Sequence, residues 1–497
     1  MRRAALVFVL LLFTITASAA DKWVTIRSKN FLLVGNASES QIRDVAENLE
    51  LFRSAYGKFF QLRDSAATVG TTVLVFKSDS AFRPFKPVYQ GKPANVSGFF
   101  LGGRERNFIV LSADMETPRV IYHEYVHRLM ADNLASLPPW FQEGFAECFS
   151  TLEIEGGDRK IRMGRAIAEH VELLNTQRFM PLAELFAVTP ESSQYNEAEK
   201  QGLFYAESWA LVHYMMLGGQ ERRNKFFEFL EDLNKGTPAP ELFEKVFQTD
   251  LASFQKVFEA YIRQRVAWPA LELTSPGGLD RNKDTMARVL SEAESEYYLG
   301  DLLLHMNRLP EAGTRLTSAV RLDPLHAGAQ ALMGRLLLKQ KNDSGAMEYL
   351  RRGIELDPEN YLAHYYYASS IQSRNRTLTD DDWALVRSEL LKTIELAPHF
   401  VAATEMLADL NLTRNTDIPQ TVEILRKART YAPGNDNLVV MLAFALARTP
   451  ERESARPLAE AVLKKTSLDP TMRRNAEAVV NYLNQTLATE VGESLKN

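Results

Sequence analysis

Short apolar runs and one long amphipathic segment alternate in residues 23–113. Four runs, WVTIRS, FLLVG, TTVLVF and NFIVLSA, have the length and the content of β-branched and aromatic residues that are typical of strands. Between the second and the third run, apolar residues recur with the period of a helix over residues 40–60. The pattern therefore predicts a small mixed sheet with a helix packed against it.

Two further helices are predicted after this sheet. In residues 116–134, ETPRVIYHEYVHRLMADNL, the apolar side chains of Ile121, Tyr125 and Leu129 lie at helical spacing. A second helix is expected to begin at the paired prolines of LPPWFQEGFAECF, because proline is well tolerated in the first turn of a helix.

After about residue 282 the chain repeats a pattern of two helices. Prolines close the predicted units, and the first interval, from Pro324 to Pro358, is 34 residues, the length of a tetratricopeptide repeat. Small residues stand at equal offsets before these prolines, where two helices pack closely: Gly300, Ala312 and Ala319, then Gly334, Ala346 and Gly353. Later units keep mainly the closing proline, and residues 471–489 are expected to cap the array.

The repeat region resembles a tetratricopeptide solenoid, an all-α structure that usually binds peptides or partner proteins on its concave face. That resemblance implies a protein partner for residues 283–497. Three consecutive tyrosines, residues 365–367, either line that face or belong to the core between helices.

A stretch rich in turn-forming residues separates the two halves of the chain. It reads WPALELTSPGGLD, residues 268–280, and contains a Pro-Gly-Gly sequence. We therefore predict a linker at 268–282, between a first domain at 21–267 and the solenoid at 283–497. Because each half has its own apolar periodicity, a fragment that ends near Pro276 is expected to fold without the solenoid.

The first twenty residues, MRRAALVFVLLLFTITASAA, have the features of a secretory signal peptide. Two arginines precede an apolar run, and small residues follow it. An uncleaved anchor is the alternative, but the run is shorter than the ~20 residues that a spanning helix needs. We expect a mature protein that begins near Asp21, is secreted or periplasmic, and has no transmembrane segment.

Charge and cysteine content exclude some classes of function. The net charge is −5 with acidic and basic residues well mixed, so the sequence offers no basic face for a nucleic acid. The single cysteine, Cys148, excludes an internal disulfide. Its apolar setting favours a small buried side chain over a ligand or a nucleophile.

The chemistry of the chain is concentrated in HEYVH, residues 123–127. His123 and His127 are four residues apart and therefore lie on one face of the predicted helix, where two imidazoles can bind one metal ion. Glu124 lies one step around the helix and can reach a water molecule at that metal. A catalytic zinc site needs a third protein ligand, which must come from elsewhere in the chain.

The two predicted helices together resemble the gluzincin metallopeptidases, and most closely the peptidase MA-like branch found in bacterial secreted proteins. The resemblance rests on H-E-x-x-H followed by W-x-x-E-G-x-A-E, which stand here as His123, Glu124, His127, Trp140, Glu143, Gly144, Ala146 and Glu147. It implies an α+β domain of the thermolysin-like fold. It also implies that His123, His127 and Glu143 bind Zn²⁺, and that Glu147 accepts the free N–H of a ligating histidine.

Zinc aminopeptidases of this group carry a tyrosine at the head of a later helix, and this tyrosine hydrogen-bonds the reaction intermediate. Tyr205, in LFYAESWALVHYMM, stands in a similar position, and Tyr195, in PESSQYNEAEK, is its rival. The resemblance thus implies hydrolysis of a peptide bond by a zinc-activated water, with Glu124 as the general base and Tyr205 as a hydrogen-bond donor to the oxyanion.

The aminopeptidase motif G-x-M-E-N has no counterpart in the chain, so an endopeptidase is the expected activity. The run NFIVLSA could pair with an extended peptide or protein substrate by strand addition. A different class of function stays open, in which the solenoid is a partner-binding scaffold and the zinc domain is catalytically idle. His213 and His305 have no spaced partners and are interpreted as structural.

Overall fold

The computed structural model describes residues 21–60, 69–89, 91–114, 119–133, 137–155, 160–189, 191–196, 198–234, 239–263, 268–274, 286–374, 378–465 and 468–494. The predicted signal peptide, residues 1–20, lies outside the described residues. Within them, no helix combines the length and the apolar character needed to cross a membrane.

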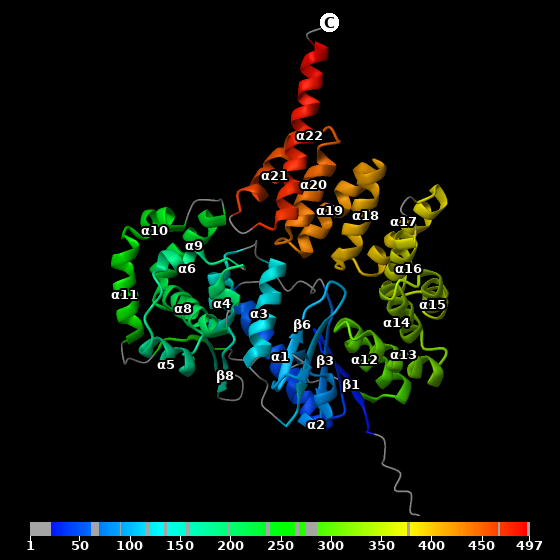
Figure 1. The fold of residues 1–497 in the computed structure, drawn as a ribbon, viewed down its shortest axis with the longest axis horizontal. Helices are drawn as coiled ribbons and strands as arrows, with labels where there is room; N and C mark the ends of the chain where they lie inside the picture. The colour runs from blue at the N-terminus through cyan, green and yellow to red at the C-terminus, as the bar shows by residue number, and fades with distance from the viewer. Residues whose placement is uncertain are drawn as a thin grey trace, which may run out of the picture.

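A six-stranded mixed sheet forms the middle of the molecule (Figure 1). Its spatial order is β11 (Ala287–Val289), β1 (Val24–Arg27), β2 (Phe31–Gly35), β3 (Thr71–Phe76), β7 (Asn107–Ser112) and β6 (Gly98–Leu101). The three central strands β2, β3 and β7 are parallel, and the outer pairings are antiparallel. The four runs expected as strands are β1, β2, β3 and β7, so the predicted mixed sheet is confirmed.

The expectation that NFIVLSA offers a free edge is wrong. This run forms β7, which is hydrogen-bonded to β3 on one side and to β6 on the other. The edge strand beside it is β6, a four-residue strand of sequence GFFL that the sequence pattern did not indicate. Any strand addition at this end of the sheet must therefore use β6.

One long helix and several short elements lie between these strands in the sequence. They are the helix α1 (Glu39–Phe60), the turns of helix α2 (Asp79–Phe82) and η1 (Arg83–Phe85), and the two-stranded ladder β4 (Val88–Tyr89) and β5 (Lys92–Pro93). The helix expected at residues 40–60 is thus present as α1.

A helical region and a second, smaller sheet follow. The helices are α3 (Arg119–Asn133), α4 (Pro139–Phe149), α5 (Ala168–Thr176), α6 (Leu182–Ala187), α7 (Ser193–Asn196), α8 (Ala198–Leu217), α9 (Gln220–Asn234), α10 (Ala239–Phe247) and α11 (Leu251–Arg263). The smaller sheet has the order β10 (Leu271–Thr274), β9 (Lys160–Met163) and β8 (Leu152–Glu155), with antiparallel pairs. Both helices expected around residues 116–149 are present, as α3 and α4.

The rest of the chain is a solenoid of helix pairs that resembles a tetratricopeptide array. The pairs are α12 (Glu292–His305) with α13 (Leu309–Leu322), α14 (Ala327–Lys339) with α15 (Asp343–Leu356), α16 (Tyr361–Arg374) with α17 (Asp380–Leu396), α18 (Val401–Arg414) with α19 (Ile418–Tyr431), and α20 (Asp436–Leu446) with α21 (Ala455–Leu463); α21 follows the short turn η2 (Arg452–Ser454). The terminal helix α22 (Pro470–Ser494) packs against α20 and α21, as the expected cap does.

Glycines bring the two helices of a pair together, as their repeated spacing predicted. A Cβ atom at Gly300 would lie 2.8 Å from the side chain of Leu316, and one at Gly334 would lie 2.5 Å from Leu350. Both distances are too short for a real side chain, so each glycine is required where its helix crosses the partner helix. The expected small-residue pattern of the first two units is confirmed.

The central strands are buried on both faces. Val73 and Val75 of β3 point into a core shared with α1, α3 and α4. Leu74 and Phe76 of the same strand point to the opposite face, into a core that contains Leu299 and other residues of the first solenoid helices. Because side chains alternate along a strand, one strand holds both layers of the protein together.

Contacts between the two predicted domains argue against their independent folding. The solenoid covers one face of the sheet, and β11, which lies just before α12, pairs with β1 at the sheet edge. Within the expected linker at 268–282, residues 271–274 form β10 and pair with β9; residues 275–282 lie outside the described residues. A fragment ending near Pro276 would expose the apolar face that contains Leu74 and Phe76.

Charged residues at the junction also join the sheet to the solenoid. Arg106, just before β7, contacts the carboxylate of Asp301 on α12 at 2.6 Å, and the Asp301 side chain is fully buried. His305, one turn further along α12, lies 3.1 Å from the same carboxylate. Burial acts against both charges of the Arg106–Asp301 pair, but the two charges stabilise each other. The pKa of Arg106 is raised and the pKa of Asp301 is lowered.

We predict that Asp301→Ala lowers the free energy of unfolding of the whole chain by about 3–5 kcal/mol, because the change leaves Arg106 without its partner at a buried junction. Urea unfolding followed by circular dichroism measures this loss. Asp380→Ala is the control, because Asp380 is 97% exposed in its ion pair with Arg414 and its loss should cost less than about 1 kcal/mol. A separate early transition of the solenoid alone would contradict the shared core.

Candidate metal centre

The candidate centre is built by the helices α3 and α4 and by the close packing of α8 against α4. α3 carries HEYVH and packs against α4, which begins with Pro139 in its first turn as expected. α4 in turn packs closely against α8. A Cβ atom at Gly144 would lie 2.2 Å from the carbonyl oxygen of Ser208 on α8, so only glycine fits at this position. The glycine of E-G-x-A-E therefore lets α8 pack closely against α4.

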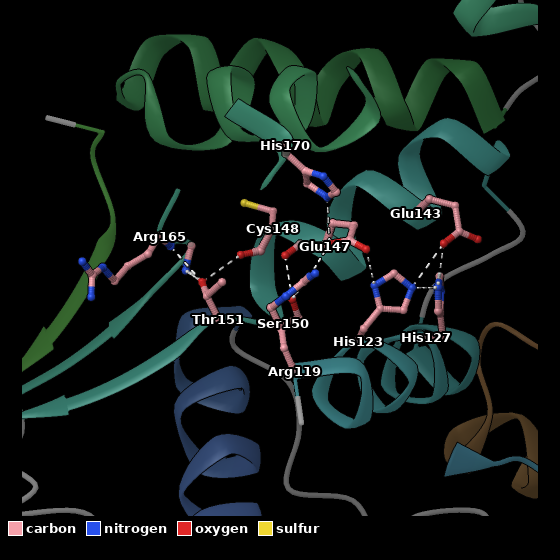
Figure 2. Close-up of polar contacts among 11 residues, drawn as sticks. Arg119, His123, His127, Glu143, Glu147, Cys148, Ser150, Thr151, Arg165 and His170 are labelled. Atoms are coloured by element: carbon pink, nitrogen blue, oxygen red, sulfur yellow. Dashed lines mark hydrogen bonds and ion pairs between the residues drawn. The ribbon is translucent and has the colours of Figure 1, made fainter. Parts of the chain in front are cut away.

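The three residues expected to bind metal are brought together. The Nε2 atoms of His123 and His127 lie 3.1 Å apart, and Oε2 of Glu143 lies 3.3 Å from the first and 3.2 Å from the second (Figure 2). These are the residues whose donor atoms cluster as a metal site requires, in the part of the chain that the structure describes.

The size of this triangle fits zinc. Tetrahedral zinc with bonds of about 2.0–2.1 Å to nitrogen and oxygen holds its ligands about 3.3 Å from one another. The donor atoms of the three side chains are separated by 3.1–3.3 Å. A larger cation with six to eight oxygen ligands would need more donors than two imidazoles and one carboxylate provide.

Burial and neighbouring charges shift the pKa values of His123 and Glu143. Burial alone would lower the pKa of His123, but hydrogen bonds and charges from Glu143 and Glu147 raise it to about 9. Burial would raise the pKa of Glu143, but the two histidines lower it to about 2. At neutral pH His123 is therefore protonated and Glu143 is charged, and a metal cation that binds there must displace the proton of His123.

Glu147 lies behind His123, as its expected role requires. Its Oε1 is 3.3 Å from Nδ1 of His123, on the side of the ring that faces away from the donor triangle. Its Oε2 accepts from Arg119 and lies 3.1 Å from Nε2 of His170 (Figure 2). Burial would raise the pKa of Glu147, but these neighbours lower it, so its carboxylate is charged.

Sequence reasoning did not identify His170 or Arg119 as parts of this centre. His170 comes from α5, which follows the smaller sheet, and no spacing in the sequence relates it to Glu147. Arg119 is the first residue of α3, one helical turn before His123, and its guanidinium also donates to Oγ of Ser150 at 3.2 Å. Arg119 and His123 are four residues apart, and this spacing is the one sequence signal that places Arg119 near the centre.

Both candidate tyrosines lie at the centre, in different positions. The hydroxyl of Tyr195 on α7 donates to Oε1 of Glu143 at 2.8 Å. The ring of Tyr205 on α8 stacks near that of His123, with centroids 6.2 Å apart. Burial, and then the charge of Glu143, raise the pKa of Tyr195 to about 12, while a hydrogen bond with Tyr205 acts in the opposite direction. The two phenols are therefore linked.

A pocket of about 430 Å³ opens beside the histidines. Glu124 and Tyr205 line it together with His123. Glu124 is partly exposed, lies next to the metal-binding residues along α3, and does not belong to the donor triangle. A candidate metal ligand, a carboxylate and a phenol thus line one pocket.

Residues interpreted as structural have structural contacts. Nε2 of His213 lies 3.1 Å from the carbonyl oxygens of Gly164 and Pro269, and burial lowers its pKa to about 4. His305 belongs to the junction with Asp301 described above. Cys148 is fully buried, and burial raises the pKa of its thiol.

A family model and several solved structures are each similar to part of the chain. A family model described as a protein of unknown function (DUF1570) matches residues 119–240, from the start of α3 into α10. This segment contains the donor triangle, Glu124, Glu147 and both tyrosines. A search of curated proteins finds no significant match.

The similar solved structures include several tetratricopeptide-repeat proteins. One from Thermus thermophilus is 14% identical, with 38% of this chain and 98% of that chain covered and a TM-score of 0.30. YrrB, described as a tetratricopeptide protein with an unusual peptide-binding site, is 16% identical over 37% of this chain and 92% of that chain, with a TM-score of 0.31. MamA from Desulfovibrio magneticus is 17% identical over 35% of this chain and 96% of that chain, with a TM-score of 0.30.

Proposed function

We propose that the protein is a zinc-dependent peptidase that hydrolyses peptide bonds within extended polypeptides. The observation that carries this proposal is the donor triangle of His123, His127 and Glu143, whose sides match the ligand separations of tetrahedral zinc. Three protein ligands leave the fourth position open, as in catalytic zinc sites and unlike structural ones. The thermolysin-like character of this domain is part of the proposal.

Zinc, when bound, supplies Lewis acidity and makes water acidic enough to lose a proton near neutral pH. The residues of the chain have separate tasks around it. Glu147, charged and held by Arg119 and His170, orients the imidazole of His123. Glu124, in the adjoining pocket, accepts the proton of the attacking water and returns it to the leaving amine.

The two tyrosines have different roles in this proposal. Tyr195 donates to Glu143 and so fixes one oxygen of that carboxylate, leaving the other directed at the histidines. Tyr205 lines the pocket with Glu124 and is the candidate donor to the oxyanion. This division assigns Tyr195 to positioning and Tyr205 to catalysis.

The edge strand β6 is the proposed binding edge for substrate. It packs beside α3, and a Cβ atom at Gly98 would lie 3.0 Å from the side chain of Ile121 on that helix. A polypeptide that adds to the free edge of β6 therefore runs alongside the helix that bears the donor triangle. Strand addition requires an extended backbone, which favours unfolded segments as substrates.

A second candidate function is a partner-binding scaffold whose metal centre has no catalytic task. It is favoured by a cavity of about 730 Å³ on the solenoid, which is larger than the pocket of about 430 Å³ beside His123. Secretion or a periplasmic location, expected from residues 1–20, is compatible with both candidates and stays a prediction.

We predict that the purified protein binds one zinc ion and that Glu143→Ala loses most of it, because two histidines alone make an incomplete site. Elemental analysis after dialysis measures the metal content. Glu228→Ala is the matched control, because Glu228 is an exposed residue of α9. Full zinc content in the Glu143 variant would remove this residue from the metal site.

We predict that Glu124→Gln keeps zinc and fold but slows peptide cleavage by roughly 10²–10⁴-fold, the usual effect of losing a general base. Glu124 lines the pocket without joining the donor triangle, so the metal content should stay equal to that of the wild type. Cleavage of a fluorogenic peptide library, with zinc content measured on the same samples, provides the comparison. Equal rates would favour the scaffold function.

We predict opposite effects for the two tyrosines. Tyr205→Phe should leave zinc affinity unchanged and lower kcat by roughly 10²–10³-fold, as for one oxyanion donor. Tyr195→Phe should weaken zinc binding by roughly tenfold or more, because it loses a hydrogen bond to a ligand. Chelator competition and steady-state kinetics on both variants test this, and reversed effects would exchange the two roles.

A further inference from the structure

The loop between β6 and β7, residues 102–106, fills part of the inner face of the solenoid. This face is formed by the first helix of each pair. Glu105 in the loop accepts from Arg335 on α14 and from the hydroxyl of Tyr366 on α16, the latter at 3.0 Å. Arg106 contacts Asp301 on α12. The loop at residues 102–106 therefore occupies the inner face over the first three helix pairs of the solenoid.

Beyond this loop the inner face is open. The cavity of about 730 Å³ begins at Arg104 and is lined by residues of α16, α18, α20 and α22. Figure 1 shows β6 beside α3, and the loop after it directed towards α16 and α18. Arg104 forms an ion pair with Glu405 on α18, so the end of the loop is fixed at the entrance of the cavity.

The cavity combines an adaptable apolar wall with one available charge. Met406, Met441 and Phe444 supply the apolar surface. Asp409 is an exposed residue of α18. It forms no hydrogen bond or ion pair with any other described residue. Partial burial of its carboxylate raises its pKa, and no neighbouring cation opposes this shift.

The other charged side chains of the cavity wall are held by contacts of their own, and Arg448 is held by aromatic rings and a carbonyl oxygen. Glu405 also accepts from Asn435 and Asn437, at 3.1 and 3.0 Å. The guanidinium of Arg448 stacks on the ring of Phe444, 4.1 Å from its centroid, and donates to the carbonyl oxygen of the same residue. Asp409 is therefore the carboxylate of the cavity wall that has no partner among the described residues, and it lies beside thioether and aromatic surface, while the guanidinium of Arg448 is held against Phe444. A carboxylate beside apolar surface suits the long stem and terminal charge of lysine or arginine.

The free edge of β6 leads to this cavity. β6 ends at Leu101, and Arg104, three residues further on, lines the cavity. At its other end, Gly98 of β6 lies against α3. A polypeptide paired with β6 thus lies beside α3. Beyond the Leu101 end of β6 it reaches the cavity.

We infer that the cavity binds a basic side chain of an extended polypeptide whose backbone lies along β6. Resting on the proposed function, this polypeptide is the substrate, and it is recognised at two places, at the metal centre and in the cavity. The solenoid then selects substrates by a lysine or arginine at a set distance from the cleaved bond, and it discriminates against folded proteins and short peptides.

The test uses unstructured, otherwise uncharged peptides that end in a hydroxamate, a zinc-chelating group. One lysine is moved along the series, position by position, and each peptide has partners with glutamine at that position or without the hydroxamate. Affinity for the zinc-loaded full-length protein is measured by fluorescence anisotropy. We expect one narrow range of spacings at which lysine improves binding by roughly tenfold or more over glutamine, as for a hydrogen bond to a charged group.

Asp409→Asn should abolish this lysine preference and leave binding of the glutamine peptides unchanged. Asp381→Asn, at an exposed position of α17, is the matched control and should keep the preference. Thermal unfolding of both variants should equal that of the wild type, because Asp409 has no partner to lose. Lysine preference that survives in Asp409→Asn, or that is independent of spacing, overturns the inference.

The same series separates this inference from the proposed function. A hydroxamate that improves binding, combined with no effect of lysine at any position, overturns the cavity's role and leaves the metal centre as proposed. A lysine preference that depends on Asp409, combined with no effect of the hydroxamate, overturns recognition at two places and the proposed zinc site, and leaves the cavity as a separate site for a basic side chain.

Discussion

The three parallel strands at the centre of the sheet carry large apolar side chains on both faces, and a strand of this kind is stable only when both faces are covered. β3 shows the constraint most clearly, since Val73 and Val75 face one layer and Leu74 and Phe76 the other. The first layer contains the helices of the metal centre, and the second is the start of the solenoid. Repeats that could have formed an appended module are thus a structural layer of the same domain.

This arrangement explains why the metal centre and the inner face of the solenoid have a fixed relation. β6 and β7 are rigidly paired, and the loop that joins them reaches the solenoid through Arg104, Glu105 and Arg106. On the other side, β6 packs on α3. The distance from the donor triangle to the inner face is therefore set by one short antiparallel pair of strands, and not by a flexible connection.

The sequence allowed good prediction wherever the information is local. His123, Glu124 and His127 are related by helical spacing, and Gly300 and Gly334 by the period of the repeat, so the two histidines of the donor triangle and the first helix pairs were predicted from local patterns. Glu143 and Glu147 were added by resemblance to a family motif, and the structure places both beside His123.

Contacts between distant segments were not predictable in this way. His170 reaches Glu147 only because the smaller sheet returns the chain to α4, and β6 is too short to show a strand pattern of its own. The shared core was not predicted because Leu74 and Phe76 are typical strand residues. Their identity does not show which element covers them. Turn-forming residues near Pro276 indicated a break in the chain, and the pairing of β11 with β1 shows that such a break does not separate two folding units.

The antiparallel pairing of Val24 with Val289 has a consequence for how the protein comes into being. The first strand of the chain obtains its outer neighbour only after the whole metal-centre region has been synthesised, and the second face of the sheet obtains its cover later still. Loop closure over such a separation is slow, and until then an unpaired strand edge and an apolar face are exposed together. The nascent chain therefore depends on protection from aggregation until the first repeats have emerged.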